Sequence, residues 1–370
     1  MKRKERALQP SHAILSATLF LSVSFAQGRS PISYAPSGDE TGSFQAQVLL
    51  ADLDNPAGLA LHPTQTKGQP FELYIAESGA GRVVRVSTST LTKDAVRKTD
   101  DIIVDFPLGT FGRQPEHRVG PLGLAFISRT KLVVSAKGES PGADLLACYS
   151  LPTSGAVLTA AEQDHAVGPL DPKLALRVDD LQFSGLAMTD KTLFATSGGR
   201  DSQGWVLKSG VEANHLAYLQ AFIELQKEVG FGAPAGIAVI PPPGPAFMVV
   251  GLMGSRETPK DSRLVFFVPA TGELALSLPT GLHDIISLAY SPSGQLYAAD
   301  FSFTDEQAGG VYRIDDARLE GRQTCRAVKI ASIIRPVGLA FAPDGSLLVT
   351  AFGQGENAKQ GTLVKITGEL

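Results

Sequence analysis

Short apolar runs separated by tight turns recur along this chain, and they set the expected secondary structure. The clearest example spans residues 335–353. An apolar run around Gly338-Leu339-Ala340 is followed by the pair Asp344-Gly345 and then by a second apolar run that ends at Ala351. Two apolar runs joined by an Asp-Gly pair are typical of a β-hairpin. The pattern therefore predicts two antiparallel strands joined by a two-residue turn.

The same unit occurs six times, aligned on a triplet that reads Gly-Leu-Ala in its clearest copies. Successive copies are 65, 62, 51, 51 and 51 residues apart. A repeat near 50 residues with three or four short strands is typical of a β-propeller, in which each unit is a sheet too thin to bury both faces alone. The first strand of each copy is almost entirely apolar, as expected between neighbouring blades near an axis. The anchor residues are Gly58, Gly123, Gly185, Gly236, Ser287 and Gly338.

The ends of the chain predict how the ring closes. A candidate outer strand precedes the next anchor in most copies, whereas the sixth copy reaches Leu370 without one. A spare strand-like run, Phe44–Leu50, precedes the first copy instead, and pairing it with the last blade would remove an exposed sheet edge. We therefore expect an all-β fold, a six-bladed β-propeller of four-stranded blades over residues 44–370, closed by the N-terminal strand. The candidate outer strands are 101–106, 173–178, 274–278 and 327–331.

Three segments do not follow the repeat. Residues 211–230 carry helical periodicity as well as strand-forming residues. Their place in the repeat favours an outer strand at Ala217–Ile223, with a short helix as the alternative. Residues 107–118 and 154–171 carry the extra length of the first two copies and are expected to be surface insertions.

The first 26 residues differ in character from the repeats. A basic start is followed by an apolar run that ends at Ala26 in the small-x-small form accepted by signal peptidases. Residues 1–26 are therefore expected to be a secretory signal, which predicts an exported protein. The alternative is an uncleaved membrane anchor, although the apolar run is short for a membrane span. Residues 27–43 are rich in Ser, Gly and Pro and are expected to form a flexible lead-in.

Charge and cysteine content narrow the possible partners and the redox chemistry. Removing residues 1–26 takes away four basic residues and one acidic residue, so the net charge changes from −4 to −7. A surface of this sign does not favour nucleic acid or an anionic membrane. The two cysteines, Cys148 and Cys325, fall in the second and fifth copies, on opposite sides of the expected ring. A disulfide needs Cα atoms within roughly 7 Å, so we expect two free thiols.

A polar sector is expected on one face of the ring, which we call the funnel face. Residues directly before each first strand and directly after each second strand should meet there. The ionisable members of this set, with an asparagine among them, fall in copies five, six and one, which become neighbours once the ring closes. Oxygen ligands of this kind suit Ca²⁺, and a histidine beside a carboxylate can act as a base. The ligand-binding candidates are Asn55, Glu77, Asp284, Asp300 and Arg335; the metal-binding candidates are Glu77, Asp284, Asp300 and Asn55; the catalytic candidates are His283, Asp284 and Arg335.

A plainer interpretation applies to the same residues. Turns are polar because they meet water, and an acid at the end of a strand can accept hydrogen bonds from neighbouring backbone. The sequence contains no Gly-x-Ser-x-Gly, His-Glu-x-x-His or phosphate-loop motif, so no reaction is indicated by a motif. The remaining histidines show no ligand spacing and are expected at the surface: His62, His117, His165 and His215.

The repeated phrases resemble those of the NHL-repeat and gluconolactonase/regucalcin-like propeller superfamily. The first copy reads Pro56–Ala60, then Leu73–Glu77 and Gly81–Val86, and the resemblance covers about residues 44–368. Its lactonase branch implies one divalent metal, held by a Glu, an Asn and an Asp that face the axis, which polarises a lactone carbonyl. This chain departs from that pattern, because Asn55-Pro56 stands where the lactonases carry Gly-Glu-Gly-Pro.

Three functional hypotheses follow. The first is an exported, monomeric propeller that binds a small ligand or a protein partner on its funnel face without chemistry of its own. The second is a Ca²⁺-dependent, lactonase-like hydrolase. The third, implied by the sugar-dehydrogenase branch of the superfamily, is a quinone-dependent enzyme for which only His283 and Arg335 are suitably placed. Metal content separates the second hypothesis from the first, and quinone absorbance identifies the third.

Overall fold

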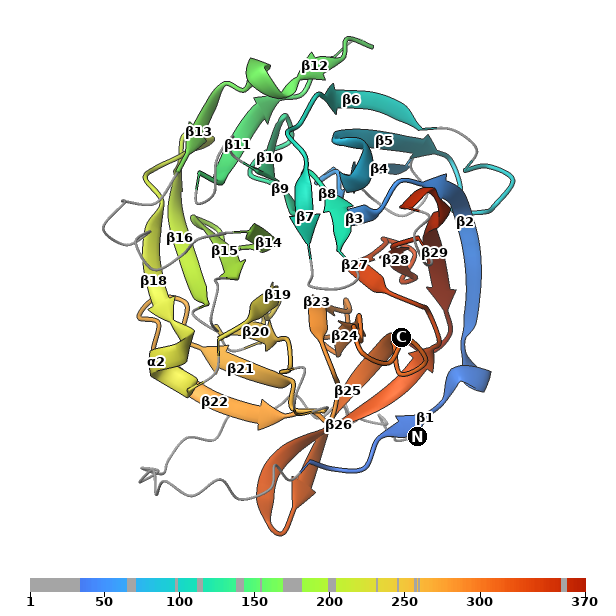
Figure 1. Ribbon diagram of the computed structural model, residues 1–370, viewed down its shortest axis with the longest axis vertical. Helices are drawn as coiled ribbons and strands as arrows, with labels where there is room; N and C mark the ends of the chain where they lie inside the picture. The colour runs from blue at the N-terminus through green and yellow to red at the C-terminus, as the bar shows by residue number, and fades with distance from the viewer. Residues whose placement is uncertain are drawn as a thin grey trace, which may run out of the picture.

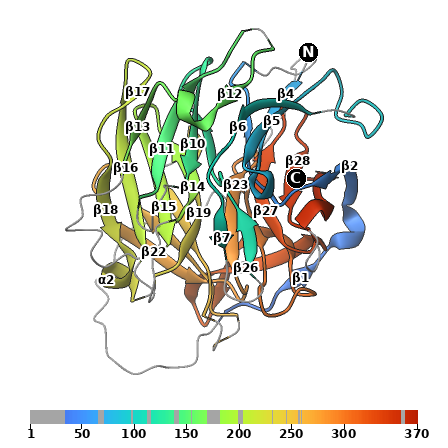
Figure 2. The same cartoon turned by 45° about the horizontal axis from the view of Figure 1, so that its top comes forward.

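The computed structural model is a ring of six small antiparallel sheets around a central axis (Figure 1). Figure 2 shows the same sheets standing side by side around the ring. The predicted all-β, six-bladed propeller is therefore confirmed. The residues that the structure describes are 34–64, 71–96, 99–111, 116–137, 143–153, 155–168, 182–198, 204–230, 232–244, 246–255, 258, 260–353 and 358–370.

Each blade is a four-stranded antiparallel meander that runs outward from the axis. The innermost strands are β3 (Pro56–Leu61), β9 (Leu124–Phe126), β14 (Gln182–Met188), β19 (Pro234–Val239), β23 (Ile285–Tyr290) and β27 (Pro336–Phe341). The second strands are β4 (Phe71–Glu77), β10 (Lys131–Ala136), β15 (Thr192–Gly198), β20 (Met248–Leu252), β24 (Leu296–Asp300) and β28 (Leu347–Ala351). The third strands are β5 (Arg82–Thr88), β11 (Leu145–Ser150), β16 (Trp205–Glu212), β21 (Arg263–Phe267), β25 (Gly310–Leu319) and β29 (Gly361–Thr367). The outer strands are β6 (Asp100–Val104), β13 (His165–Val167), β18 (Gln220–Glu224), β22 (Leu274–Pro279), β26 (Arg322–Ala331) and β2 (Gln45–Leu53).

The core lies between the blades rather than inside any one of them. Every residue of the second strands β20, β24 and β28 is buried. Such strands need apolar residues on both faces, because a neighbouring blade covers each face, and this explains why they read as continuous apolar runs instead of alternating ones.

Threonine hydroxyls near the ends of second strands link adjacent blades. Thr196 accepts a hydrogen bond from the Gly185 N–H (2.9 Å) and donates one to the Ala235 carbonyl of the next blade (2.6 Å). Thr350 accepts from a backbone N–H of its own blade and donates to a carbonyl of the first blade in the same way. The recurring glycine therefore marks a place where two backbones approach closely.

The ring closes through the N-terminal strand, as predicted. Strand β2 pairs with β29 from Gln45 opposite Thr367 to Leu53 opposite Gly361. In Figure 1 the blue β2 lies beside the red β29, so the two ends of the chain complete one blade. This pairing gives the last blade its fourth strand.

Both alternatives for residues 211–230 are found, one after the other. The hairpin strand β17 (His215–Leu216) is followed by the outer strand β18, which pairs with β16. The helix α2 (Leu225–Val229) then ends at Gly230, whose positive φ of 67° suits a helix C-terminus. The strand begins three residues later than expected, because the hairpin takes up the intervening residues.

Residues 154–171 are not simply the surface insertion that was expected. They contain the short strand β12 (Leu158–Thr159), the 3-10 helix η3 (Ala160–Glu162) and β13, the outer strand of the second blade. Leu146 and Cys148 of β11 pair with the two ends of β13. The expected outer strand at 173–178 lies outside the described residues.

Residues 107–118 are also placed differently from the expectation. Strands β7 (Gly109–Phe111) and β8 (His117–Val119) form a two-stranded hairpin that reaches toward the centre of the ring (Figure 1). His117 and Val119 are buried, because their side chains are covered by apolar residues of other blades. The hairpin is thus part of the core, not a surface loop.

The described part of the lead-in is also bound to the fold. Strand β1 (Gly38–Asp39) pairs with β26, η1 (Thr41–Ser43) follows it, and Glu40 forms an ion pair with Arg313 (2.9 Å). The expected secretory signal at 1–26 lies outside the described residues. Within the described parts of the chain, no helix is both long and apolar enough to cross a membrane.

Both cysteines are buried and free, as expected. Cys148 lies in the second blade and Cys325 in the fifth. Two further 3-10 helices, η2 (Ser78–Ala80) and η5 (Ala358–Gln360), complete the described elements.

Candidate functional site

The fifth blade brings two of the predicted carboxylates together. Asp300, at the end of β24, is fully buried and accepts hydrogen bonds from the backbone N–H groups of His283 (3.0 Å) and Asp284 (2.7 Å). Burial raises the pKa of Asp300 to about 6, although these backbone donors oppose the rise. Asp284 in turn accepts the N–H of Phe303 (2.9 Å). The two carboxylates hold the loops before and after this pair of strands in place.

His283 is buried beside these acids. Both of its ring nitrogens lack a hydrogen-bond partner among the described residues. Burial lowers the pKa of His283, while the nearby carboxylates of Asp284 and Asp305 oppose that shift. Its neutral ring is therefore the favoured form near pH 7.

In the first blade, the predicted residues are already paired with protein groups. One oxygen of Glu77 accepts the Asp54 N–H (2.9 Å), and the other lies 2.6 Å from the Arg82 guanidinium. Asn55 takes a positive φ of 43° and donates its side-chain N–H to the Arg118 carbonyl of strand β8 (3.0 Å). The plainer interpretation, an acid that organises backbone, describes Glu77 well.

Arg335, just before β27, is 4% exposed and also adopts a positive φ of 51°. Its guanidinium donates to the Gly353 carbonyl (2.9 Å) and forms a close ion pair with Glu306. The ion pair joins the sixth blade to the loop that follows β24 in the fifth. The buried cation is thereby compensated, as a buried charge requires.

His117, which was expected at the surface, is the residue that sequence reasoning missed. It is 5% exposed, and its ring packs edge-on against Phe301 (centroids 5.6 Å apart) and Phe352 (5.4 Å). Burial lowers its pKa to about 4, with the Arg335 cation adding to the effect and Glu306 opposing it. Its Nε2 atom has no hydrogen-bond partner among the described residues.

The β7–β8 hairpin connects the two halves of the polar sector. At its base, Arg118 forms an ion pair with Asp54 of the first blade (2.9 Å). At its other side, Phe111 and His117 lie against Phe301, which directly follows β24 of the fifth blade. The funnel face at blades five, six and one is therefore covered by a hairpin that does not belong to the repeat.

The predicted metal ligands do not form a calcium site as they stand. Ca²⁺ takes six to eight oxygen ligands. Glu77 is bound to Arg82 and to backbone, and Asp300 is bound to two backbone N–H groups. Asn55 keeps an oxygen, Oδ1, with no partner among the described residues, but one oxygen is not a site. Nowhere in the described ranges do three His, Cys, Asp or Glu side chains gather in a way that could hold a metal ion.

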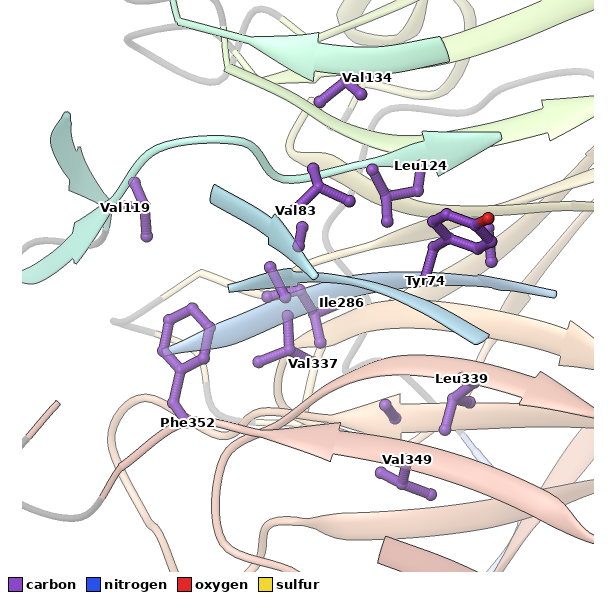
Figure 3. Packing of buried hydrophobic residues seen from close by; sticks show 14 of the residues in the cluster. Tyr74, Val83, Val119, Leu124, Val134, Ile286, Val337, Leu339, Val349 and Phe352 are labelled. Carbon is purple, nitrogen blue, oxygen red and sulfur yellow. The ribbon is translucent and has the colours of Figure 1, made fainter. Parts of the chain in front are cut away.

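An axial cavity of about 100 Å³ lies between the inner strands of all six blades. Phe111 and Phe352 line it from the side of the hairpin. Figure 3 shows Phe352 in one buried cluster with the inner-strand residues Ile286 and Val337. The cavity therefore lies next to the aromatic side chains that surround His117.

Comparison with known proteins gives a likeness in structure. No family model matches the chain, and no curated protein sequence matches it. A gluconolactonase from Xanthomonas campestris matches with a TM-score of 0.54 at 14% identity, over 94% of this chain and 99% of that one. Regucalcin from Agrobacterium tumefaciens, described as a calcium-binding protein, matches with a TM-score of 0.54 at 14% identity, over 90% and 96%. A Thermus thermophilus protein described as a glucose dehydrogenase reaches 0.55 at 15% identity, over 88% and 100%.

The fold is that of the gluconolactonase and regucalcin propellers. This confirms the fold that the sequence resemblance implied. At such identities the likeness concerns the fold alone, so the chemistry has to be argued from this chain's own residues.

Proposed function

We propose that the protein binds a small molecule on its funnel face, beside His117 of the β7–β8 hairpin. The observation that carries this proposal is the buried Nε2 atom of His117, which has no partner among the described residues. Buried polar groups in native proteins are nearly always paired, and an unpaired one costs roughly 1–3 kcal/mol. A ligand that offers a donor or an acceptor at this atom would supply the missing hydrogen bond.

The surroundings of His117 favour a ligand that is polar, uncharged and flat on one side. The imidazole is neutral at pH 7 because its pKa is about 4. Arg335 and Glu306 compensate each other's charge. The rings of Phe301 and Phe352 pack against the imidazole, so its immediate surroundings are apolar. A sugar lactone has this character, with a carbonyl and hydroxyls on an apolar ring skeleton.

Lactone hydrolysis is the reaction to test first, and it is favoured over binding alone by the neighbours named for gluconolactone and glucose chemistry. In such a reaction water adds to the lactone carbonyl and the ring C–O bond breaks. We propose that the Nε2 atom of neutral His117, which has no partner among the described residues, takes the proton from water and returns it to the leaving ring oxygen. We assign no step to a metal, because Glu77 is bound to Arg82 and to backbone, and Asp300 is bound to two backbone N–H groups.

The test combines binding and turnover with matched variants. The mature protein would be titrated calorimetrically with a panel of sugar lactones, and acid release would be followed in a pH-stat. His117→Phe keeps a flat ring but removes both nitrogens, and His62→Phe changes a histidine outside the site. We expect His117→Phe to reduce turnover by about 10²-fold or more, the usual scale for a lost general base, and His62→Phe to leave it unchanged.

Each outcome has a distinct meaning. Binding without turnover, lost in His117→Phe, would support a ligand-binding protein and exclude the hydrolase. If no lactone of the panel binds, sugar lactones are excluded as ligands of this site. If His117→Phe behaves like the unmodified protein, the proposed site is wrong.

Two cofactors belong to the alternative hypotheses. Calcium is suggested by the regucalcin neighbour, whose description names it as calcium-binding. Elemental analysis of protein purified without chelator would test this, and bound Ca²⁺ should be lost in Asp284→Asn if that residue is a ligand. A bound quinone, the third hypothesis, would show as near-ultraviolet absorbance in the purified protein.

We also propose export and a monomeric state. The basic and apolar character of residues 1–26 supports cleavage after Ala26. Mass spectrometry of the mature chain from a secreting host would give the N-terminus, and light scattering would give the mass in solution. A chain that keeps Met1, or a stable dimer, would contradict these proposals.

A further inference from the structure

The two phenylalanines that pack against His117 occupy the same position in neighbouring blades. Phe301 directly follows β24 of the fifth blade, and Phe352 directly follows β28 of the sixth. Each donates its backbone N–H to the carbonyl of the residue just before the first strand of its own blade. The two bonds run from Phe301 to Asp284 (3.0 Å) and from Phe352 to Arg335 (3.0 Å). The residue at the start of each blade therefore holds the backbone of one ring that contacts His117.

Arg335 holds the Phe352 segment through its side chain as well. Its guanidinium donates to the carbonyl of Gly353, the next residue (2.9 Å), so the backbone is bound on both sides of the Phe352 side chain. The same guanidinium forms the ion pair with Glu306 of the fifth blade. Because Arg335 is buried, its charge needs such a partner. Arg335 thus links Phe352 to the blade that carries Phe301.

The charges that act on His117 belong to this same ion pair. Burial lowers the pKa of His117 to about 4, with the Arg335 cation adding to the effect and Glu306 opposing it. Two members of one ion pair therefore act on the imidazole with opposite signs. The other ionisable groups of the surrounding elements have partners of their own: Arg118 with Asp54 at the base of the hairpin, and Asp284 and Asp300 with backbone N–H groups of the fifth blade.

We propose that Arg335 is a positioning residue for His117: it holds Phe352 against the imidazole, and its cation, balanced by Glu306, keeps that imidazole unprotonated. Its part in catalysis rests on the proposed function, because a general base has to be unprotonated at the pH of the reaction. Its action on His117 does not, since a cation disfavours protonation of a neighbouring group whether or not a ligand is bound.

Opposite changes to the ion pair test this proposal. In Arg335→Gln the cation is lost and the Glu306 carboxylate remains, so the pKa of His117 should rise by about one unit, a usual effect of a neighbouring charge. In Glu306→Gln the cation remains without its partner, so the pKa should fall below that of the unmodified protein. Carbon-13 NMR of the imidazole, recorded on the mature protein between about pH 3 and pH 8, would measure both values. His117→Phe assigns the resonance.

A purely structural role predicts a different result. If the ion pair only packs the fifth and sixth blades together, breaking it from either side admits water to His117 and raises its pKa in both variants. That result would overturn the proposal, and so would an unchanged pKa in Arg335→Gln. Arg313→Gln is the matched control, because it breaks the ion pair with Glu40 at the outer strands of the fifth blade (2.9 Å) and should leave the pKa of His117 unchanged.

Two further variants keep the test decisive if Arg335→Gln does not fold. Arg335→Lys keeps the cation without the planar guanidinium and should retain most of the lowered pKa of His117. The double variant Arg335→Gln/Glu306→Gln leaves no unpaired buried charge. It should raise the pKa by less than one unit, because Arg335 acts on His117 more strongly than Glu306 does. A low pKa kept in this double variant would overturn the proposal.

Turnover of the lactone panel separates this proposal from the proposed function. If a lactone is hydrolysed, the acid limb of the pH–rate profile should move upward in Arg335→Gln by the same amount as the pKa of His117. An acid limb that stays in place while that pKa rises would overturn the part of Arg335 in the reaction. If no lactone is hydrolysed, the proposed function fails, and the NMR titration still decides whether Arg335 acts on His117.

Discussion

The funnel face holds two buried groups whose pKa values are shifted in opposite directions. Burial lowers the pKa of His117 from 6.5 to about 4, and burial raises the pKa of Asp300 from 3.8 to about 6. Each pKa unit corresponds to 1.36 kcal/mol, so each shift is worth about 3 kcal/mol. Both side chains are at most 5% exposed, so solvent screens these contributions little.

The two contributions to stability change in opposite directions with pH. The folded-state pKa of His117 lies below its unfolded value, so its contribution is present above pH 6.5 and is lost as the pH falls toward 4. The folded-state pKa of Asp300 lies above its unfolded value, so its contribution is present below pH 3.8 and is lost as the pH rises through 6. Between pH 4 and 6.5 the two should therefore nearly cancel in the unmodified protein.

Single substitutions should reveal how each group makes the free energy of unfolding depend on pH. His117→Phe removes one titration and Asp300→Asn removes the other, and the free energy of unfolding would be measured by urea titration from pH 4 to pH 7. Relative to the unmodified protein, His117→Phe should gain about 3 kcal/mol on going from pH 7 to pH 4, and Asp300→Asn should lose about 3 kcal/mol. Asp300→Asn will also be less stable at every pH, because an amide offers one oxygen to two N–H donors.

The test is whether the difference in unfolding free energy between each variant and the unmodified protein changes with pH. Asp316→Asn, at an exposed position, is the matched control and should show no such slope. The reasoning would be refuted if either variant ran parallel to the unmodified protein across this range. Parallel curves for His117→Phe would mean that its imidazole meets water in solution, which would also weaken the proposed binding site.

The remaining predictions concern the two cysteines, a hydrogen-bonded threonine between adjoining blades and a pair of histidines. Titration of the denatured, unreduced protein should find both Cys148 and Cys325 as free thiols, and a count of none would contradict the blade assignment. Thr350→Val should lower the free energy of unfolding by about 1–3 kcal/mol, because two backbone groups of adjoining blades lose their shared hydroxyl, whereas Thr350→Ser should retain most of it. At the rim between blades two and three, His165 accepts a backbone N–H of β17 at Nε2 (3.0 Å), so its proton must lie on Nδ1, 3.3 Å from Nδ1 of His215. Nitrogen-15 NMR should find this tautomer at pH 7, and because burial lowers the pKa of His165, its stabilising contribution should be lost as the pH falls below 6.5.

The ring could be predicted from the sequence because each blade repeats the same local sequence pattern. An apolar first strand, an Asp-Gly or similar turn and a second apolar strand are all encoded within about 20 residues, as in 335–353. Ring closure followed from a missing strand at one end and a spare strand at the other. These features depend on short-range pattern, which survives in the sequence even where identity to known proteins is only 14–15%.

The candidate site was only partly predictable, for a physical reason. The positions of Glu77 and Asp300 at the ends of second strands were expected, and the plainer interpretation allowed backbone partners without identifying the groups. Those partners are backbone N–H groups, which have no signature in the sequence and become available only when a loop folds back over the strand. A carboxylate that binds a metal and one that binds backbone therefore look the same in sequence.

His117 was missed because its environment comes from distant parts of the chain. Its contacts, Phe301 and Phe352, follow it by more than 180 residues and lie in other blades. The available signal was length: the first two anchors are 65 residues apart instead of 51, and the surplus contains Phe111 and His117. An insertion that carries a phenylalanine and a histidine and stands directly before an inner strand is a reason to look toward the axis.

That insertion places a two-stranded hairpin outside the four-stranded blades. The repeat builds a ring whose funnel-face carboxylates are largely used to hold loops together. The β7–β8 hairpin then brings His117, whose Nε2 atom has no partner among the described residues, to the polar sector, and it places Phe111 in the lining of the axial cavity. Because one short segment contacts both places, changes within it should alter ligand recognition. The specificity of this protein is therefore expected to be encoded in residues 109–119 more than in the repeats.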